Sequence, residues 1–133
     1  MKPLKARVTK GLNLGSLVDV ADNSGAKGVR IIAVKKGKGR KGRQLACGMG
    51  DLVKIVVKEG SKELRKQIFW AVVVRQRKPF RRLTGERISF QSNAVALLKD
   101  EFGNPKGTQI KGPISKEVGD RWPFIAKIAS TVV

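Results

Sequence analysis

Histidine and tyrosine are absent from the 133 residues of this chain, and cysteine occurs once, at Cys47. The lack of histidine removes the commonest general base and metal ligand, which excludes Ser-His-Asp hydrolysis and histidine-ligated zinc. A single cysteine excludes an intramolecular disulfide and a multi-cysteine zinc site, and suits a reducing cytosol. Asp51 and Glu59 are isolated carboxylates beside lysines, where surface ion pairs are commoner than acid–base chemistry. We therefore expect no enzyme, no metal and no cofactor.

Long apolar runs are also missing. No stretch approaches the ~20 apolar residues of a membrane span, and residues 1–10 lack the apolar core of a signal peptide. The hydrophobic fraction of 41% argues against disorder, and a chain of this length can bury its own core. We expect a single cytoplasmic domain over residues 1–133, with residues 1–15 as an extended N-terminal segment, no membrane partner and no homo-oligomer.

Acidic residues are scarce where cations are dense. The net charge is +19, and residues 1–82 hold 22 Lys and Arg against 5 Asp and Glu, whereas residues 83–133 hold 7 against 5. A cationic field of this strength attracts a polyanion and makes association depend on salt. The first two-thirds therefore favour contact with phosphate. The less charged last third predicts a surface for a protein neighbour or the closing part of the core.

Short runs rich in Val, Ile and Leu, separated by turn residues, dominate the sequence. The predicted strands cover residues 17–21, 29–34, 52–57, 70–75, 87–91 and 94–98. No ten-residue amphipathic helix separates them, so the pattern indicates an all-β-dominated fold, a small antiparallel barrel. Helix is expected only near the end: Ser115 is a good N-cap for a helix to Asp120, and Pro123 suits the first turn of a second helix to Ala129.

Residues 35–43 combine six cations with three glycines and no acid. A solvated flexible loop is the alternative, but adjacent cations repel unless phosphates lie between them, and glycines let the backbone follow an irregular surface. Gly37, Gly39 and Gly42 also match a dinucleotide fingerprint, yet no helix follows, so that match is accidental. The candidate RNA-binding residues here are Lys35, Lys36, Lys38, Arg40, Lys41 and Arg43.

Residues 75–82 place five cations around Phe80, directly after an apolar strand. Arginine forks suit bidentate phosphate contact, and a strand that continues into a basic hairpin would project them beyond the barrel. Packing of Phe80 on the edge of the core is as reasonable as stacking on a base, and Trp70 and Trp122 are expected in the core. The candidate RNA-binding residues here are Arg75, Arg77, Lys78, Phe80, Arg81 and Arg82.

Several separated motifs in register carry a family resemblance. They are residues 17–27 (LVDVADNSGAK), 50–53 (GDLV), 71–75 (AVVVR), 93–94 (NA), 107–108 (GT) and 112–113 (GP). Together they resemble the universal large-subunit ribosomal protein family fourteen, from about residue 15 to the end. Residues 63–66 (ELRK), 74–78 (VRQRK) and 120–123 (DRWP) resemble its archaeal and eukaryotic branch. The chain departs from the family at Thr84-Gly85, where Asp-Gly is usual, and at Gln91-Ser92, which replaces a common acidic pair.

The resemblance implies a five-stranded barrel with a protruding hairpin and two short C-terminal helices. It also implies binding to large-subunit rRNA near the sarcin-ricin loop, contact with small-subunit rRNA in an intersubunit bridge, and docking of the anti-association factor called initiation factor six. The rigid, charge-poor end suits contact with that factor and with neighbouring ribosomal proteins. The candidate protein-contact residues are Thr108, Gln109, Ile110, Gly112, Pro113 and Lys127.

Two other functions compete with a structural role in the ribosome. A free, sequence-tolerant RNA-binding chaperone on an OB-like barrel would present several aromatic residues on one platform, whereas here five Phe and two Trp are scattered. An RNA-processing enzyme would need the catalytic groups that the chain lacks.

Overall fold

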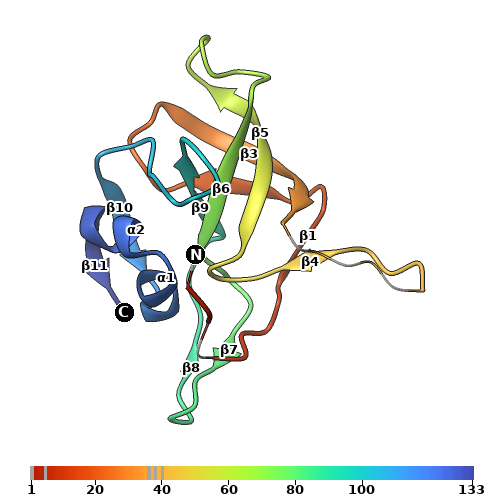
Figure 1. Cartoon of the computed structure of the whole chain (residues 1–133), viewed down its shortest axis with the longest axis vertical. Coiled ribbons are helices and arrows are strands. Elements are labelled where there is room, and N and C mark those ends of the chain that lie inside the picture. Colours follow the sequence, from red (N-terminus) through yellow and green to blue (C-terminus); the bar gives the residue numbers. More distant parts are fainter. Residues whose placement is uncertain (1, 5, 36, 38, 40) are drawn as a thin grey trace.

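The computed structural model describes residues 2–4, 6–35, 37, 39 and 41–133. Its centre is a closed barrel of five strands in the order β2-β3-β5-β6-β9. These strands are β2 (Leu17–Val20), β3 (Ala26–Val34), β5 (Leu52–Gly60), β6 (Ile68–Arg75) and β9 (Ala94–Leu98). The predicted small barrel is therefore confirmed (Figure 1).

Strand pairing in the barrel is antiparallel at every neighbouring pair except one. β2 and β9 pair in parallel, with Asp19 opposite Ala94 and Val20 opposite Val95. The predicted antiparallel pairing holds at the other four neighbouring pairs, and the barrel closes through this parallel pair. A hairpin cannot join two parallel strands, and here most of the chain separates them.

Alternation places one face of each barrel strand in the core. In β5, Leu52, Val53, Ile55 and Val57 are buried while Lys54 and Lys58 are exposed. β9 is buried along its whole length, and so are residues 71–74 of β6. These two strands therefore have cover on their outer side as well as in the barrel.

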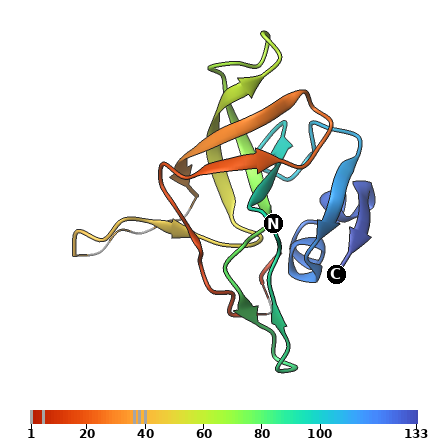
Figure 2. The ribbon, with the colours of Figure 1, turned by 180° about the vertical axis from the view of Figure 1, so that it is seen from behind.

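The C-terminal part of the chain supplies part of that cover. It consists of β10 (Ile110–Ile114), α1 (Lys116–Arg121), α2 (Pro123–Ile128) and β11 (Ala129–Val132). Both helices begin as predicted: the Ser115 hydroxyl accepts from Val118 N, and Pro123 opens α2. Trp122 is 2% exposed, and its Nε1 donates to Gly50 O at 2.8 Å. This anchor ties the helices, which are blue in Figure 2, to the loop that leads into β5.

Outside the barrel, the described residues form three further strand pairs. β1 (Leu12–Asn13) pairs with β4 (Ala46–Cys47), β7 (Phe80–Arg81) pairs with β8 (Arg87–Ile88), and β10 pairs in parallel with β11. The predicted strand over residues 87–91 is thus shorter than expected and belongs to a hairpin. In the described part of the chain, no helix is long and apolar enough to cross a membrane.

Candidate nucleic-acid interface

The loop between β3 and β4 carries the first predicted group of cations. Lys41 and Arg43 are exposed on an arm that extends from the barrel on the side away from the helices (Figures 1 and 2). Lys41 and Gly42 have φ angles of 53° and 70°, so the chain makes a left-handed turn here, which glycine adopts freely. The structure thus leaves these two charges open to solvent.

The other cations of this group divide into two sets. Lys35 is half-buried, and its Nζ lies 2.7 Å from Glu101 Oε2 and 5.8 Å from the centre of the Trp70 ring. Its charge therefore already has a partner inside the protein. Trp70 was expected in the core. It packs against the core but is only partly buried, and Lys54 lies over its ring. Lys36, Lys38 and Arg40 lie outside the described residues.

The second predicted group of cations lies on and beside the basic hairpin, which we define as β7, β8 and the connecting residues 82–86. Arg82 N donates to Glu86 O at 2.8 Å, and Gly85 N donates to Arg82 O at 2.9 Å. Gly85 has a φ of 96°, so the three-residue turn has the left-handed glycine that such loops require. The left-handed position is filled by Gly85, so the turn tolerates Thr84 at the place where the family usually has Asp.

Burial separates the residues of this group, and alternation along β7 sets Phe80 and Arg81 on opposite faces. Arg77, Lys78 and Arg81 are exposed, whereas Phe80 is 2% exposed and faces the protein. A ring buried to that extent cannot stack on an RNA base, so the prediction of Phe80 as an RNA contact is corrected. Phe80 pairs across the hairpin with Ile88 and fixes the hairpin to the core.

Arg82 points to the same side as Phe80. Its Nε lies 2.8 Å from Glu117 Oε1 and its Nη2 lies 3.3 Å from Glu117 Oε2, which is a bidentate pair. Nη2 also donates to Val133 O at 2.6 Å. The structure therefore places Arg82 in an internal anchor between the hairpin and α1, away from the exposed cations.

Arg75 is also engaged within the protein. Its Nη1 donates to Lys111 O at 2.8 Å and to Pro113 O at 3.2 Å, which holds β10 against the end of β6. Burial lowers the pKa of the Arg75 guanidinium from its usual value, and nearby Asp19 opposes that shift. A Cβ at Gly112 would overlap the Arg75 guanidinium, so the glycine permits this close approach. Arg75 does not project with the exposed cations.

The N-terminal segment, by which we mean residues 2–4 and 6–11, lies beside the basic hairpin and was missed as a candidate. Gln76 is fully buried: its Nε2 donates to Thr9 O at 2.8 Å and to Lys78 O at 2.9 Å, and its Oε1 accepts from Gly11 N. This side chain ties the segment to the strand that leads into the hairpin. Arg7 and Lys10 are exposed in the segment and add to the cations of that region. The available signal was the absence of any acid before Asp19.

Chemically reactive groups are few near these cations. Burial, reinforced by the charge of Asp51, raises the pKa of the Cys47 thiol to about 12, so the thiol stays protonated at neutral pH. Among the residues that the structure describes, no three His, Cys, Asp or Glu side chains form a group that could hold a metal.

The predicted protein-contact residues lie on the C-terminal part and the loop that precedes it. Asn23 orients the loop: its Oδ1 accepts from Thr108 N at 2.8 Å and its Nδ2 donates to Thr108 Oγ1 at 2.9 Å. Thr108 and Gln109 are exposed, but Ile110 is fully buried and cannot offer its side chain to a partner, which corrects that prediction. The sequence marked Asn23 only as a turn residue, because Thr108 is 85 positions away.

The remaining residues of this group lie close by in the fold. Gly112 and Lys127 are exposed and Pro113 is half-buried. Ile110 pairs with Ala129, which brings the end of α2 next to the start of β10. Lys127 Nζ lies 5.3 Å from the centre of the exposed Phe124 ring. This end of the molecule thus presents a mixed polar and apolar surface on hydrogen-bonded elements.

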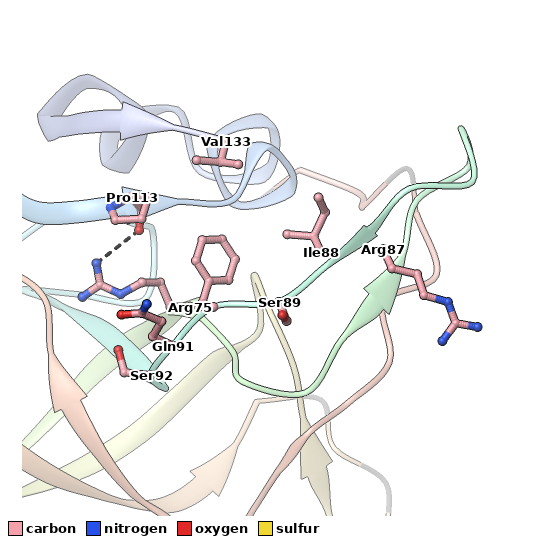
Figure 3. A pocket seen from close by; sticks show the side chains of 9 residues that line it. Arg75, Arg87, Ile88, Ser89, Gln91, Ser92, Pro113 and Val133 are labelled. Carbon is pink, nitrogen blue, oxygen red and sulfur yellow. Dashed lines mark hydrogen bonds between the residues drawn. The ribbon is translucent and has the colours of Figure 1, made fainter.

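A groove of about 550 Å³ separates the basic hairpin from β10 (Figure 3). Pro113, Val133 and Ile88 contribute apolar walls, and Arg87 borders the groove with its side chain directed away from Pro113 and Val133 in Figure 3. The groove therefore marks a boundary between the cationic hairpin and the C-terminal surface. The residues that line it are Arg75, Arg87, Ile88, Ser89, Phe90, Gln91, Ser92, Pro113 and Val133.

Comparison with known proteins gives one consistent result. The family model described as ribosomal protein L14p/L23e matches residues 11–133. The chain is 55% identical over 133 residues to the large ribosomal subunit protein uL14 of Nanoarchaeum equitans, with all of both chains covered. It is 47% identical to that of Halobacterium salinarum, again with both chains fully covered. Identity to that of Pyrobaculum aerophilum is 51%, over 98% of this chain and 92% of the relative.

Proposed function

The chain belongs to the ribosomal protein L14p/L23e family, and from this premise we propose that its exposed cations bind large-subunit rRNA near the sarcin-ricin loop. As a large-subunit ribosomal protein it works in the cytoplasmic ribosome, with rRNA and neighbouring ribosomal proteins as partners. The resemblance read from the sequence, including its archaeal and eukaryotic type, is confirmed.

The proposed RNA face rests on one observation: some basic side chains of the second group point to solvent, while others bond within the protein. Arg77, Lys78 and Arg81 point to solvent without an ion pair among the described residues, while Arg75 and Arg82 satisfy internal acceptors. Unpaired exposed cations on the basic hairpin and on the bend that precedes it fit contact with phosphate, which positions a protein on RNA. Arg7 and Lys10 of the N-terminal segment extend this face, and Lys41 and Arg43 form a second arm of it.

The proposed protein face comprises Thr108, Gln109, Gly112, Pro113 and Lys127. Its backbone is held by Asn23, by Arg75 and by pairing with β11, so little ordering entropy would be lost when a partner binds. We assign to this end the docking of initiation factor six and contact with ribosomal neighbours. Contact with small-subunit rRNA in an intersubunit bridge belongs to the same proposal and rests on the family resemblance.

We further propose that the protein is structural, forms a single domain and catalyses no reaction. The family match favours this role over a free RNA chaperone on an OB-like barrel. Sedimentation separates the two: a ribosomal constituent from a native lysate should stay with large subunits through a moderate salt wash, whereas a free chaperone should wash off.

A salt titration of binding tests the RNA face. If the exposed cations neutralise roughly 6 to 10 phosphates, the logarithm of affinity for protein-free large-subunit rRNA should fall with the logarithm of salt concentration with a slope of about −5 to −9. Filter binding between 50 and 400 mM KCl, as an approximate range, measures that slope. A slope near zero would mean that these cations do not contact phosphate.

A further inference from the structure

The basic hairpin contains an arrangement of two like charges that the protein alone does not explain. Arg81 and Arg87 are direct cross-strand partners in the pairing of β7 with β8. Both side chains are exposed, and their neighbours Phe80 and Ile88 form the pair on the opposite, inward face. Arg87 was not among the residues predicted from the sequence.

The register brings the two arginines as close as a sheet allows. Hydrogen-bonded and non-hydrogen-bonded pairs alternate along an antiparallel ladder, and Arg82 N bonds Glu86 O. Arg81 and Arg87 therefore form the non-hydrogen-bonded pair that follows. In such pairs the Cα atoms lie about 4.5 Å apart and the side chains are nearest to each other.

No acid of the described chain neutralises this pair. Neither Arg81 nor Arg87 forms an ion pair within 4.0 Å among the described residues, whereas Glu86 and Glu117 lie 3.9 Å and 2.8 Å from Arg82. Arginine does not lose its proton in proteins, so the repulsion cannot be relieved by deprotonation. Directly opposed like charges destabilise a ladder, and this ladder has only two pairs of residues. An external anion would convert the repulsion into a binding site.

We propose that Arg81 and Arg87 together grip a single phosphate of the large-subunit rRNA backbone. The inference rests on the proposed rRNA-binding role and deepens it. Each guanidinium is a planar fork that donates two parallel hydrogen bonds to phosphate oxygens, so two forks from one face surround the group from both sides. The inward anchor of Phe80 and Arg82 holds the strands in register, so the clamp is formed before RNA binds.

The test uses the full chain, protein-free large-subunit rRNA from archaeal ribosomes, and the variants Arg81→Gln, Arg87→Gln and their combination. One shared phosphate predicts that the double variant lowers the magnitude of the salt slope by about 0.7 to 0.9, the value for one phosphate. Two separate phosphates predict a decrease of about 1.4 to 1.8 instead. At 0.1 M salt the double variant should bind about five- to eightfold more weakly, and each single variant by less than that.

Arg77→Gln is the matched control because Arg77 is an exposed arginine with no cross-strand arginine. If Arg77→Gln weakens binding but the Arg81 and Arg87 variants leave it unchanged, the clamp is refuted while the RNA face survives. If none of the variants changes binding or its salt slope, the proposed RNA face itself fails. A decrease of the slope by 1.4 to 1.8 in the double variant would also overturn the shared phosphate, in favour of two contacts.

Thermal unfolding of the free protein gives an independent measurement. With no RNA present and at low salt, either single variant removes the repulsion and should raise the melting temperature by about 1 to 4 °C. Arg77→Gln should leave it unchanged. A fall in the melting temperature on removing Arg81 or Arg87 would refute the repulsive pair on which the clamp depends.

Discussion

Replacement of Arg82 should separate an internal role from an RNA-binding role, because its neighbour Arg81 faces the opposite way. The side chains of Arg82 and Glu117 are only 15% and 10% exposed and form a bidentate pair. Arg82→Met removes that pair and the bond to Val133 O, and leaves Glu117 as a buried unpaired charge. We expect the cost of leaving Glu117 buried without a partner to lower the free energy of unfolding more than the lost attraction between the two charges does.

The expected cost follows from the burial of the pair. Breaking a fully buried pair costs about 3 to 5 kcal/mol, and the remaining exposure here lowers our estimate to about 2 to 4 kcal/mol. At about 3 to 4 °C per kcal/mol for a chain of this size, the melting temperature should fall by roughly 6 to 16 °C. The double variant Arg82→Met/Glu117→Met removes both charges and should recover stability to within about 1 kcal/mol of the parent.

Urea unfolding at moderate salt and rRNA binding, measured on the same samples, test this expectation. Arg81→Met is the control, since it is the same substitution one residue away on the exposed face. It should keep or slightly raise the free energy of unfolding and weaken RNA binding, the reverse of Arg82→Met. The reasoning would be wrong if Arg82→Met unfolded like the parent and lost as much RNA affinity as Arg81→Met.

Two further perturbations address the loop and the protein face. Replacement of Gly37, Gly39 and Gly42 by Ala should weaken rRNA binding because it restricts the backbone without removing a cation, while the melting temperature changes little. Gly15→Ala is the control for Gly42, because both glycines have a positive φ with open space around the Cβ position and Gly15 lies outside the loop. A collapse of the fold with normal binding would make the loop structural. Thr108→Arg with Lys127→Glu should permit incorporation into large subunits but weaken docking of initiation factor six in co-sedimentation. If this double variant fails to assemble into large subunits but still docks the factor normally, the separation into an RNA face and a protein face is wrong.

Local chemistry was enough to predict much of the secondary structure. Alternation, turn residues and Val-rich runs identified the five barrel strands, and Ser115 and Pro123 marked the starts of both helices. These features depend on residues within a few positions of one another, so the sequence carries them directly. The strong cationic bias of residues 1–82 likewise predicted a polyanion partner, because charge composition needs no fold to be read.

The tertiary structure decided which members of each predicted site are available. Arg81 and Arg82 are adjacent and chemically identical, yet the pairing of β7 with β8 turns one outward and lets the other meet Glu117, 35 residues away. Ile110 is buried for a similar reason, since β10 packs inward at that position. The parallel closure of β2 on β9 also depends on distant pairing. The sequence determined composition and periodicity, whereas the exposure of each charge depended on strand register and on contacts between distant segments.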